Sequence, residues 1–277
     1  MNNDKHYIEN PEDIDWEYFW SKKLESKKDR QKDWNKAAPH FHKSNLRDDY
    51  KTSLLKKLDI LSKEDTVLDI GCGEGTITIP IAKKVKKVKG IDSSENMLKI
   101  LNEKCDKENV NNVNTVLKPI EEIKYEDIGN YDAVVASRSL NSIIPIKKTL
   151  EEINKIANKY VFITLFGPEN WKLEREFQEY IGNDPKDFPA YTYLINILYN
   201  MGIYANVERM DIESYREYDS IEDAIDNGKF RIDLLNDEEI EKLKVYLNKV
   251  LKKDPKTGKL YNNKDKADWI LIWWKKK

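Results

Sequence analysis

The sequence predicts an α/β fold with a seven-stranded, mostly parallel sheet and helices on both faces. Short apolar runs recur through residues 66–166, helical stretches separate them, and the first run ends in closely spaced glycines. Strands that alternate with helices are joined by crossover connections, which place them parallel in one covered sheet. We therefore expect a doubly wound core.

The expected elements follow in chain order. A helix with Leu54, Leu55 and Leu58 at helical spacing precedes the first strand. Seven strands are expected, at 66–70, 88–91, 113–117, 131–136, 160–166, 205–215 and 269–274. Helices are expected after the glycines and at 94–105, 146–157, 171–181, 191–201, 221–225 and 237–251.

Two additions to the core are expected. Residues 1–50 are polar but carry several aromatic side chains, and Pro39 interrupts them, so we expect an N-terminal helical lid or extension. The α/β domain then spans 51–277, with a helical insertion after the fifth strand at about 167–204. No internal repeat divides the chain further.

The composition limits the classes of partner. The 277 residues include 48 basic and 50 acidic side chains, a net charge of -2, which favours neither nucleic acid nor an anionic membrane. Two cysteines and three histidines lack metal-ligand spacing, so no metal site is expected. No secretory signal or membrane-spanning run is found, and a cytoplasmic location is expected.

The strongest motif is the segment from Leu68 to Thr76, in which Gly71, Gly73 and Gly75 follow an apolar strand. Glycine permits positive φ and has no Cβ, so a ligand can lie against bare backbone at the carboxyl end of the strand. A nucleoside fits such a turn. The alternative is a glycine-rich loop that only reverses the chain.

A carboxylate accompanies the glycine turn. Asp92 ends the next strand, where it can accept hydrogen bonds from both hydroxyls of a ribose. The alternative is that Asp92 caps the helix that begins after Ser93 and Ser94.

These residues resemble the class I S-adenosylmethionine (SAM)-dependent methyltransferases, particularly the branch with quinone-biosynthesis and other small-molecule enzymes. The first motif of that family, an acidic residue, any residue and Gly-x-Gly-x-Gly, is matched by Asp69 and the three glycines. The resemblance covers roughly residues 54–166. It implies a Rossmann-like fold, a methyltransferase domain at 51–277, SAM as cofactor and S-adenosylhomocysteine as product.

The resemblance also implies roles for particular residues. Asp69 and the loop backbone, with Cys72 as an ordinary small residue in the loop, would face the methionine moiety of the cofactor. Asp92 would hold the ribose, while Ser93 and Met97 would border the adenine. Further along the chain, the expected cofactor contacts are Ile120 through its backbone, Glu121 through its side chain, and Ser137.

Two residues are candidates for catalysis. His40 lies in the aromatic N-terminal segment that is expected to fold over the cofactor, and the favoured alternative is a surface histidine beside a turn. Arg138 follows the fourth strand, where it can hold an anionic acceptor or form a structural salt bridge. Aromatic residues of the N-terminal segment and of the inserted helices either wall an acceptor pocket or anchor these helices on the core.

The sequence therefore predicts methyl transfer from SAM to a small-molecule acceptor, without a nucleic-acid or membrane partner. Three alternatives stay open. A nicotinamide-dependent oxidoreductase needs the spacing G-x-G-x-x-G, and Thr76 occupies its third glycine position. A catalytically silent SAM-binding or scaffold protein has the same cofactor motif, and an RNA or protein methyltransferase is the third alternative.

Overall fold

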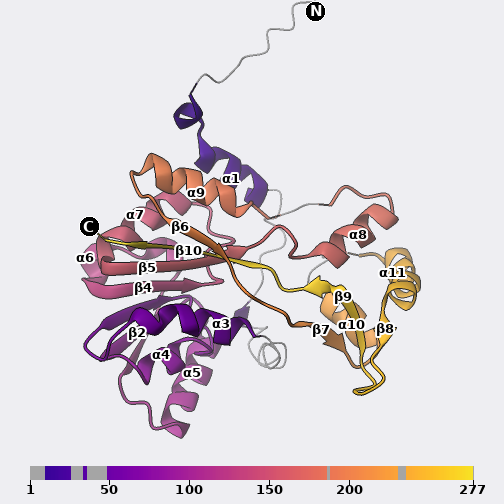
Figure 1. The fold of residues 1–277 in the computed structure, drawn as a ribbon, viewed down its shortest axis with the longest axis horizontal. Coiled ribbons are helices and arrows are strands. Elements are labelled where there is room, and N and C mark those ends of the chain that lie inside the picture. The colour runs from indigo at the N-terminus through magenta and orange to yellow at the C-terminus, as the bar shows by residue number, and fades with distance from the viewer. Residues whose placement is uncertain (1–9, 26–33, 36–48, 186–187, 230–234, 277) are drawn as a thin grey trace, which may run out of the picture.

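The computed structural model describes residues 10–25, 34–35, 49–185, 188–229 and 235–276. A seven-stranded sheet lies at its centre, in the order β3-β2-β1-β4-β5-β10-β6. The first five strands are parallel, and β10 is antiparallel to both β5 and β6. The predicted fold class, a mostly parallel seven-stranded α/β sheet, is confirmed (Figure 1).

The strands of this sheet lie close to their predicted positions in the first half of the chain. Their bounds are β1 Thr66–Ile70, β2 Lys87–Asp92, β3 Val113–Leu117, β4 Tyr131–Ser137, β5 Ala157–Phe166, β6 Asn206–Arg209 and β10 Trp269–Lys275. Neighbouring side chains of a strand point to opposite faces. Leu68 therefore packs in one core cluster and Val67 in the other.

Helices cover both faces of the sheet (Figure 1). One face carries α1 (Trp16–Glu25), α7 (Ile146–Ile156) and α9 (Tyr191–Asn200). The other carries α3 (Tyr50–Lys57), α4 (Thr78–Ala82) and α5 (Glu95–Lys107). A short helix, α6 (Tyr125–Ile128), and the 3-10 turns Pro11–Asp13, Leu58–Ile60 and Ile120–Glu122 complete this part of the chain.

A smaller unit is built from the segments before and after β6. Its three-stranded sheet has the order β7-β9-β8, with β7 at Tyr215–Tyr218, β8 at Lys252–Lys253 and β9 at Leu260–Lys266. The helices α8 (Lys172–Tyr180), α10 (Ile221–Lys229) and α11 (Asp237–Val250) pack with it around a third apolar cluster. This unit lies beside the main sheet (Figure 1).

One strand prediction in the second half of the chain is wrong. The expected strand at 205–215 forms β6 only at 206–209, and its last residue, Tyr215, begins β7 in the other sheet. Between the two strands, Asp49 accepts backbone hydrogen bonds from Glu213 and Ser214. The strand β9 was not predicted. Its buried positions include Asn262 and Asp265, so it lacks the apolar alternation that identifies a strand.

The N-terminal helix α1 is anchored on the helical layer formed by α7 and α9. Trp20 is fully buried and donates from Nε1 to the carbonyl oxygen of Ile143 at 2.7 Å. The ring of Trp16 lies 6.0 Å from that of Tyr193 on α9. Of the two interpretations of the aromatic residues, anchoring describes these two tryptophans. None of the described helices is long and apolar enough to cross a membrane.

Candidate cofactor and acceptor site

The glycine turn lies at the carboxyl edge of the parallel strands, between β1 and α4. The amides of Gly71 and Cys72 both donate to the carbonyl oxygen of Ile91, at 2.7 and 3.0 Å, so the turn is tied to the end of β2. All three glycines have positive φ, of 73° for Gly71, 52° for Gly73 and 85° for Gly75. The sequence folds into this turn because glycine adopts such angles without steric cost.

The three glycines have different surroundings. A Cβ on Gly71 would lie 2.3 Å from Cβ of Ser139, and one on Gly75 would lie 2.3 Å from Cδ1 of Leu101. At Gly73 no atom of the described residues lies within 4 Å of the same position. The first and third glycines therefore allow close packing against the protein, whereas a side chain at the second would meet none of the described residues.

Asp92 joins the second strand to the glycine turn. Its Oδ2 accepts from the amide of Gly73 at 2.8 Å, and its Oδ1 accepts from the amide of Ser94 at 2.9 Å. Burial raises the pKa of this carboxyl, against the backbone hydrogen bonds that lower it. The capping residue of α5 is Ser94, whose Oγ accepts from the amide of Met97 at 3.2 Å.

Asp69 is a buried carboxylate directly below the turn. Only 1% of the residue is exposed, and Oδ2 accepts from the hydroxyl of Thr78 at 2.6 Å. Burial raises the pKa of Asp69 to about 7, the hydrogen bond from Thr78 lowers it, and the charge of Asp92 raises it. Its Oδ1 has no hydrogen-bond partner among the described residues.

The other predicted cofactor residues lie around this turn at different depths. Cys72 and Met97 are buried, with 6% and 2% of their surface exposed. Ile120 is half-buried, and its Cδ1 would lie 3.5 Å from a Cβ on Gly71. Ser93 and Glu121 are exposed. Ile120 thus lies beside the turn, and His40 lies outside the described residues.

Ser137 ends β4 and Arg138 follows it, beside a tyrosine that the sequence analysis did not single out. Tyr50 is fully buried, and its hydroxyl lies 2.7 Å from Oγ of Ser137 and 2.6 Å from Oγ1 of Thr164. Arg138 has φ of 61°, and its guanidinium lies over the ring of Tyr50, 4.3 Å from the centroid. No pattern marks Tyr50, because its partners are distant in sequence.

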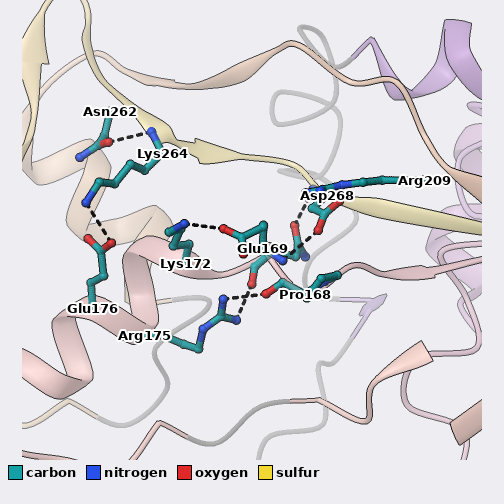
Figure 2. Close-up of polar contacts among 10 residues, drawn as sticks. Pro168, Glu169, Lys172, Arg175, Glu176, Arg209, Asn262, Lys264 and Asp268 are labelled. Atoms are coloured by element: carbon teal, nitrogen blue, oxygen red, sulfur yellow. Dashed lines mark hydrogen bonds and ion pairs between the residues drawn. The ribbon is translucent and has the colours of Figure 1, made fainter. Parts of the chain in front are cut away.

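The turn after β5 is held against the start of β10. The carboxylate of Asp268 accepts from Nε of Arg209 and from the amide of Glu169, both at 2.8 Å (Figure 2). A Cβ on Gly167 would lie 2.3 Å from this carboxylate. Glycine is therefore required where the two segments meet.

A cleft of about 590 Å³ lies beside this turn. The charges that line it are largely paired, Arg209 with Asp268 and Lys172 with Glu169, as Figure 2 shows. The lining residues are Glu169, Lys172, Arg209, Met210, Asp211, Ile212, Glu213, Asn263, Lys264, Lys266, Ala267 and Asp268. Four cationic and four anionic side chains line the cleft, so it selects for neither sign of charge.

A doubly wound sheet with a glycine turn and a carboxylate on neighbouring strands defines a Rossmann-like nucleotide-binding domain. Comparison with known proteins agrees. The family model described as a methyltransferase domain matches residues 61–194. An uncharacterized protein of Haemophilus influenzae is 31% identical over 226 residues, which cover 81% of this chain and 81% of that protein. The chain belongs to the class I SAM-dependent methyltransferases.

Two other relatives match shorter parts of the chain. A probable ribosomal RNA small subunit methyltransferase A of Methanosphaera stadtmanae is 30% identical over 107 residues, 39% of this chain and 38% of that protein. A ubiquinone biosynthesis O-methyltransferase of Acinetobacter baumannii is 35% identical over 77 residues, 28% of this chain and 32% of that protein. The matches thus span 38% and 32% of the two relatives, well under two thirds of either.

A solved structure has the same fold. The YcgJ protein of Bacillus subtilis aligns with a TM-score of 0.56 at 16% identity, over 82% of this chain and 98% of that chain.

Proposed function

We propose that this enzyme transfers a methyl group from SAM to a small-molecule acceptor, with the cofactor in the glycine turn. The observation that carries the proposal is the hydrogen bond that the amide of Gly73 donates to Asp92, at a position where a side chain would meet none of the described residues. A ribose placed there would lie on bare backbone and within reach of the carboxylate. In this proposal residues 51–277 form the catalytic domain.

The buried carboxylate Asp69 fits the other end of the cofactor. Its Oδ1 is a buried acceptor without a partner among the described residues, and an ammonium group is a donor that would satisfy it. Ile120 and Ser137 lie beside the same turn, on its β3 and β4 sides. The two carboxylates, Asp92 at the turn and Asp69 beneath it, therefore fit a nucleoside that carries a cationic amino group on its tail.

When bound, SAM supplies an electrophilic methyl group on a sulfonium. The chain's own task is then to orient the acceptor behind that carbon and to exclude water. Asp69 and Asp92 would hold the two ends of the cofactor, and Ser137 is kept in place by Tyr50. Arg138, at the end of β4, would hold an anionic group of the acceptor.

A small-molecule acceptor is supported by the balanced charge of the chain. One partial relative is named for O-methylation in ubiquinone biosynthesis and another for methylation of ribosomal RNA, so the acceptor class needs its own test. The two free cysteines, Cys72 and Cys105, are both buried and fit the proposed cytoplasmic location.

The decisive experiment is a calorimetric titration of the full chain with SAM, S-adenosylhomocysteine and NAD. We expect tight binding of the first two and none of NAD. Asp92→Ala should weaken SAM binding at least tenfold, because hydrogen bonds to a charged group each contribute about 1.5–3 kcal/mol. The variant also loses the hydrogen bonds from the amides of Gly73 and Ser94, so its unfolding midpoint should fall, and the titration is made at a temperature at which both proteins are folded.

The matched control is Asp219→Ala, which removes an exposed carboxylate that pairs with Lys259 in the smaller unit. It should leave the SAM affinity unchanged. If Asp92→Ala binds SAM as tightly as the wild type does, the ribose lies elsewhere. If the chain binds NAD but not SAM, the assignment of SAM as cofactor is wrong. If SAM binds but no methylated product forms with a panel of small acceptors or with RNA, the chain is a silent SAM-binding protein.

A further inference from the structure

Two large residues adopt the left-handed backbone conformation on the acceptor side of the site. Arg138, after β4, has φ of 61°, and Trp171, before α8, has φ of 65°. For residues of this size the conformation is strained, and such strain concentrates at functional sites. The guanidinium of Arg138 lies over one end of a group of aromatic rings, and the ring of Trp171 belongs to the same group.

These rings form a continuous group, which we call the aromatic run: Tyr50, Trp269, Phe166, Trp171 and Phe188. The ring of Trp269 lies 5.4 Å from that of Tyr50 and 4.8 Å from that of Phe166. Phe166 in turn lies 5.3 Å from Trp171 and 5.1 Å from Phe188. Tyr50 and Trp269 are buried, whereas the other three rings are half-buried.

The aromatic run begins next to the glycine turn. Its first ring, Tyr50, is hydrogen-bonded to Ser137 at the end of β4. Two residues further, Ser139 donates to the carbonyl oxygen of Ile70 at 2.6 Å and packs against Gly71. A methyl donor in the turn would therefore lie beside this end of the run, and an acceptor would reach it along the half-buried rings.

Each end of the aromatic run carries a guanidinium. That of Arg138 lies over Tyr50 and 5.6 Å from the ring centroid of Trp269. That of Arg216 lies 5.5 Å from the ring centroid of Trp171, where it binds Asp265 at 2.7 Å and lies 3.5 Å from Glu174. Arg216 thus belongs to a charge cluster of the smaller unit, and the guanidinium next to the glycine turn is that of Arg138.

We infer that the three half-buried rings of the aromatic run form the acceptor surface and that the acceptor is a flat, conjugated molecule with an acidic substituent held by Arg138. Aromatic faces stack on flat rings, and the planar guanidinium fork matches a carboxylate in two hydrogen bonds. The inference rests on the proposed function. If the rings only pack the fold, no ligand is needed. The inference instead requires a ligand that is selected by both its flat shape and its negative charge.

The test is calorimetry on the full chain saturated with S-adenosylhomocysteine, with three probes: 2-naphthoate, 2-naphthylmethanol and cyclohexanecarboxylate. The first is flat and anionic, the second is flat and neutral, and the third is anionic but not flat. We expect 2-naphthoate to bind at least tenfold more tightly than either of the others. Equal affinities, or no binding of 2-naphthoate, would overturn the inference.

Variants separate the two requirements. Arg138→Met should weaken 2-naphthoate about tenfold and leave 2-naphthylmethanol unchanged, and Arg138→Lys should recover part of the loss. Phe188→Leu should weaken both naphthalene probes. A matched control is Lys89→Met, which removes another cation from an aromatic ring, that of Tyr131 at the amino end of β4, 5.7 Å away. A second control is Phe19→Leu on α1. Neither control should change the affinity for any of the three probes.

S-Adenosylhomocysteine binding, measured on the same samples, separates this inference from the proposed function. If that ligand binds and 2-naphthoate does not, only the acceptor surface is wrong. If neither S-adenosylhomocysteine nor SAM binds, the proposed function itself fails. Loss of 2-naphthoate binding in Phe19→Leu or Lys89→Met would show a general loss of structure, and would overturn the assignment to the aromatic run.

Discussion

The buried carboxylate Asp69 makes the stability of the fold depend on pH, and a substitution that removes the carboxylate should remove this dependence. Burial raises its pKa from 3.8 to about 7, so the folded state binds a proton that the unfolded chain has lost. Stability from this group is full below pH 3.8 and is lost as the pH rises through about 7. Each pH unit in that window corresponds to about 1.4 kcal/mol.

The substitution Asp69→Asn removes the titration and retains an acceptor for Thr78. Between pH 5 and pH 8 the wild type should therefore lose roughly 3 kcal/mol relative to this variant. Urea unfolding of both proteins at the two pH values, followed by tryptophan fluorescence, measures the difference. A stability difference that stays the same at pH 5 and pH 8 would refute the reasoning.

Exposed Asp127 provides the control, because its hydrogen bond with Lys118 lowers the pKa of Asp127. Stability from such a group is present above its unfolded pKa of 3.8 and is lost only as the pH falls below it, so the stability difference between the wild type and Asp127→Asn should be the same at pH 5 and pH 8. The same logic extends to the ligand. A cation placed at Oδ1 of Asp69 would lower its pKa, so SAM binding near pH 7 should release a proton. Titrations in buffers of different ionisation enthalpy measure that release.

Two further substitutions test the packing. Gly167→Ala would bring Cβ to 2.3 Å from the Asp268 carboxylate, so we expect a loss of about 1–3 kcal/mol in the free energy of unfolding; an unchanged denaturation midpoint would contradict the close approach. Trp20→Phe removes the hydrogen bond to Ile143 and leaves a buried carbonyl oxygen without that donor, which should cost about 1–2 kcal/mol. Chemical denaturation measures it, and Tyr18→Phe at the exposed surface of α1 is the control, with no expected change.

The first half of the fold was predictable because its signals are local. Val67 and Leu68 alternate between the two faces of β1, and the glycines that follow need no partner elsewhere in the chain to make their turn. Asp92 comes at the end of a recognisable strand, so its position beside the turn follows from the parallel order of β1 and β2. The cofactor side of the candidate site is therefore within reach of sequence analysis.

The acceptor side was not predictable from local patterns. The hydroxyl of Tyr50 bonds to residues 87 and 114 positions away, and Trp171 meets Phe166 only because the turn between them folds onto Asp268. The strand β9 buries Asp265 against Arg216 and Tyr218, an arrangement with polar residues where a strand pattern has apolar ones. Such pairings depend on tertiary contacts between distant segments.

The position of β10 has a consequence for the order in which the chain can fold during synthesis. Within the described residues β6 reaches the sheet only through β10, which lies between it and β5. The outer edge of β5 therefore stays open until residues 269–275 have left the ribosome, although the parallel strands can already have formed. A stalled or shortened nascent chain would expose that edge together with the apolar surface that Leu271 and Ile272 cover in the finished fold.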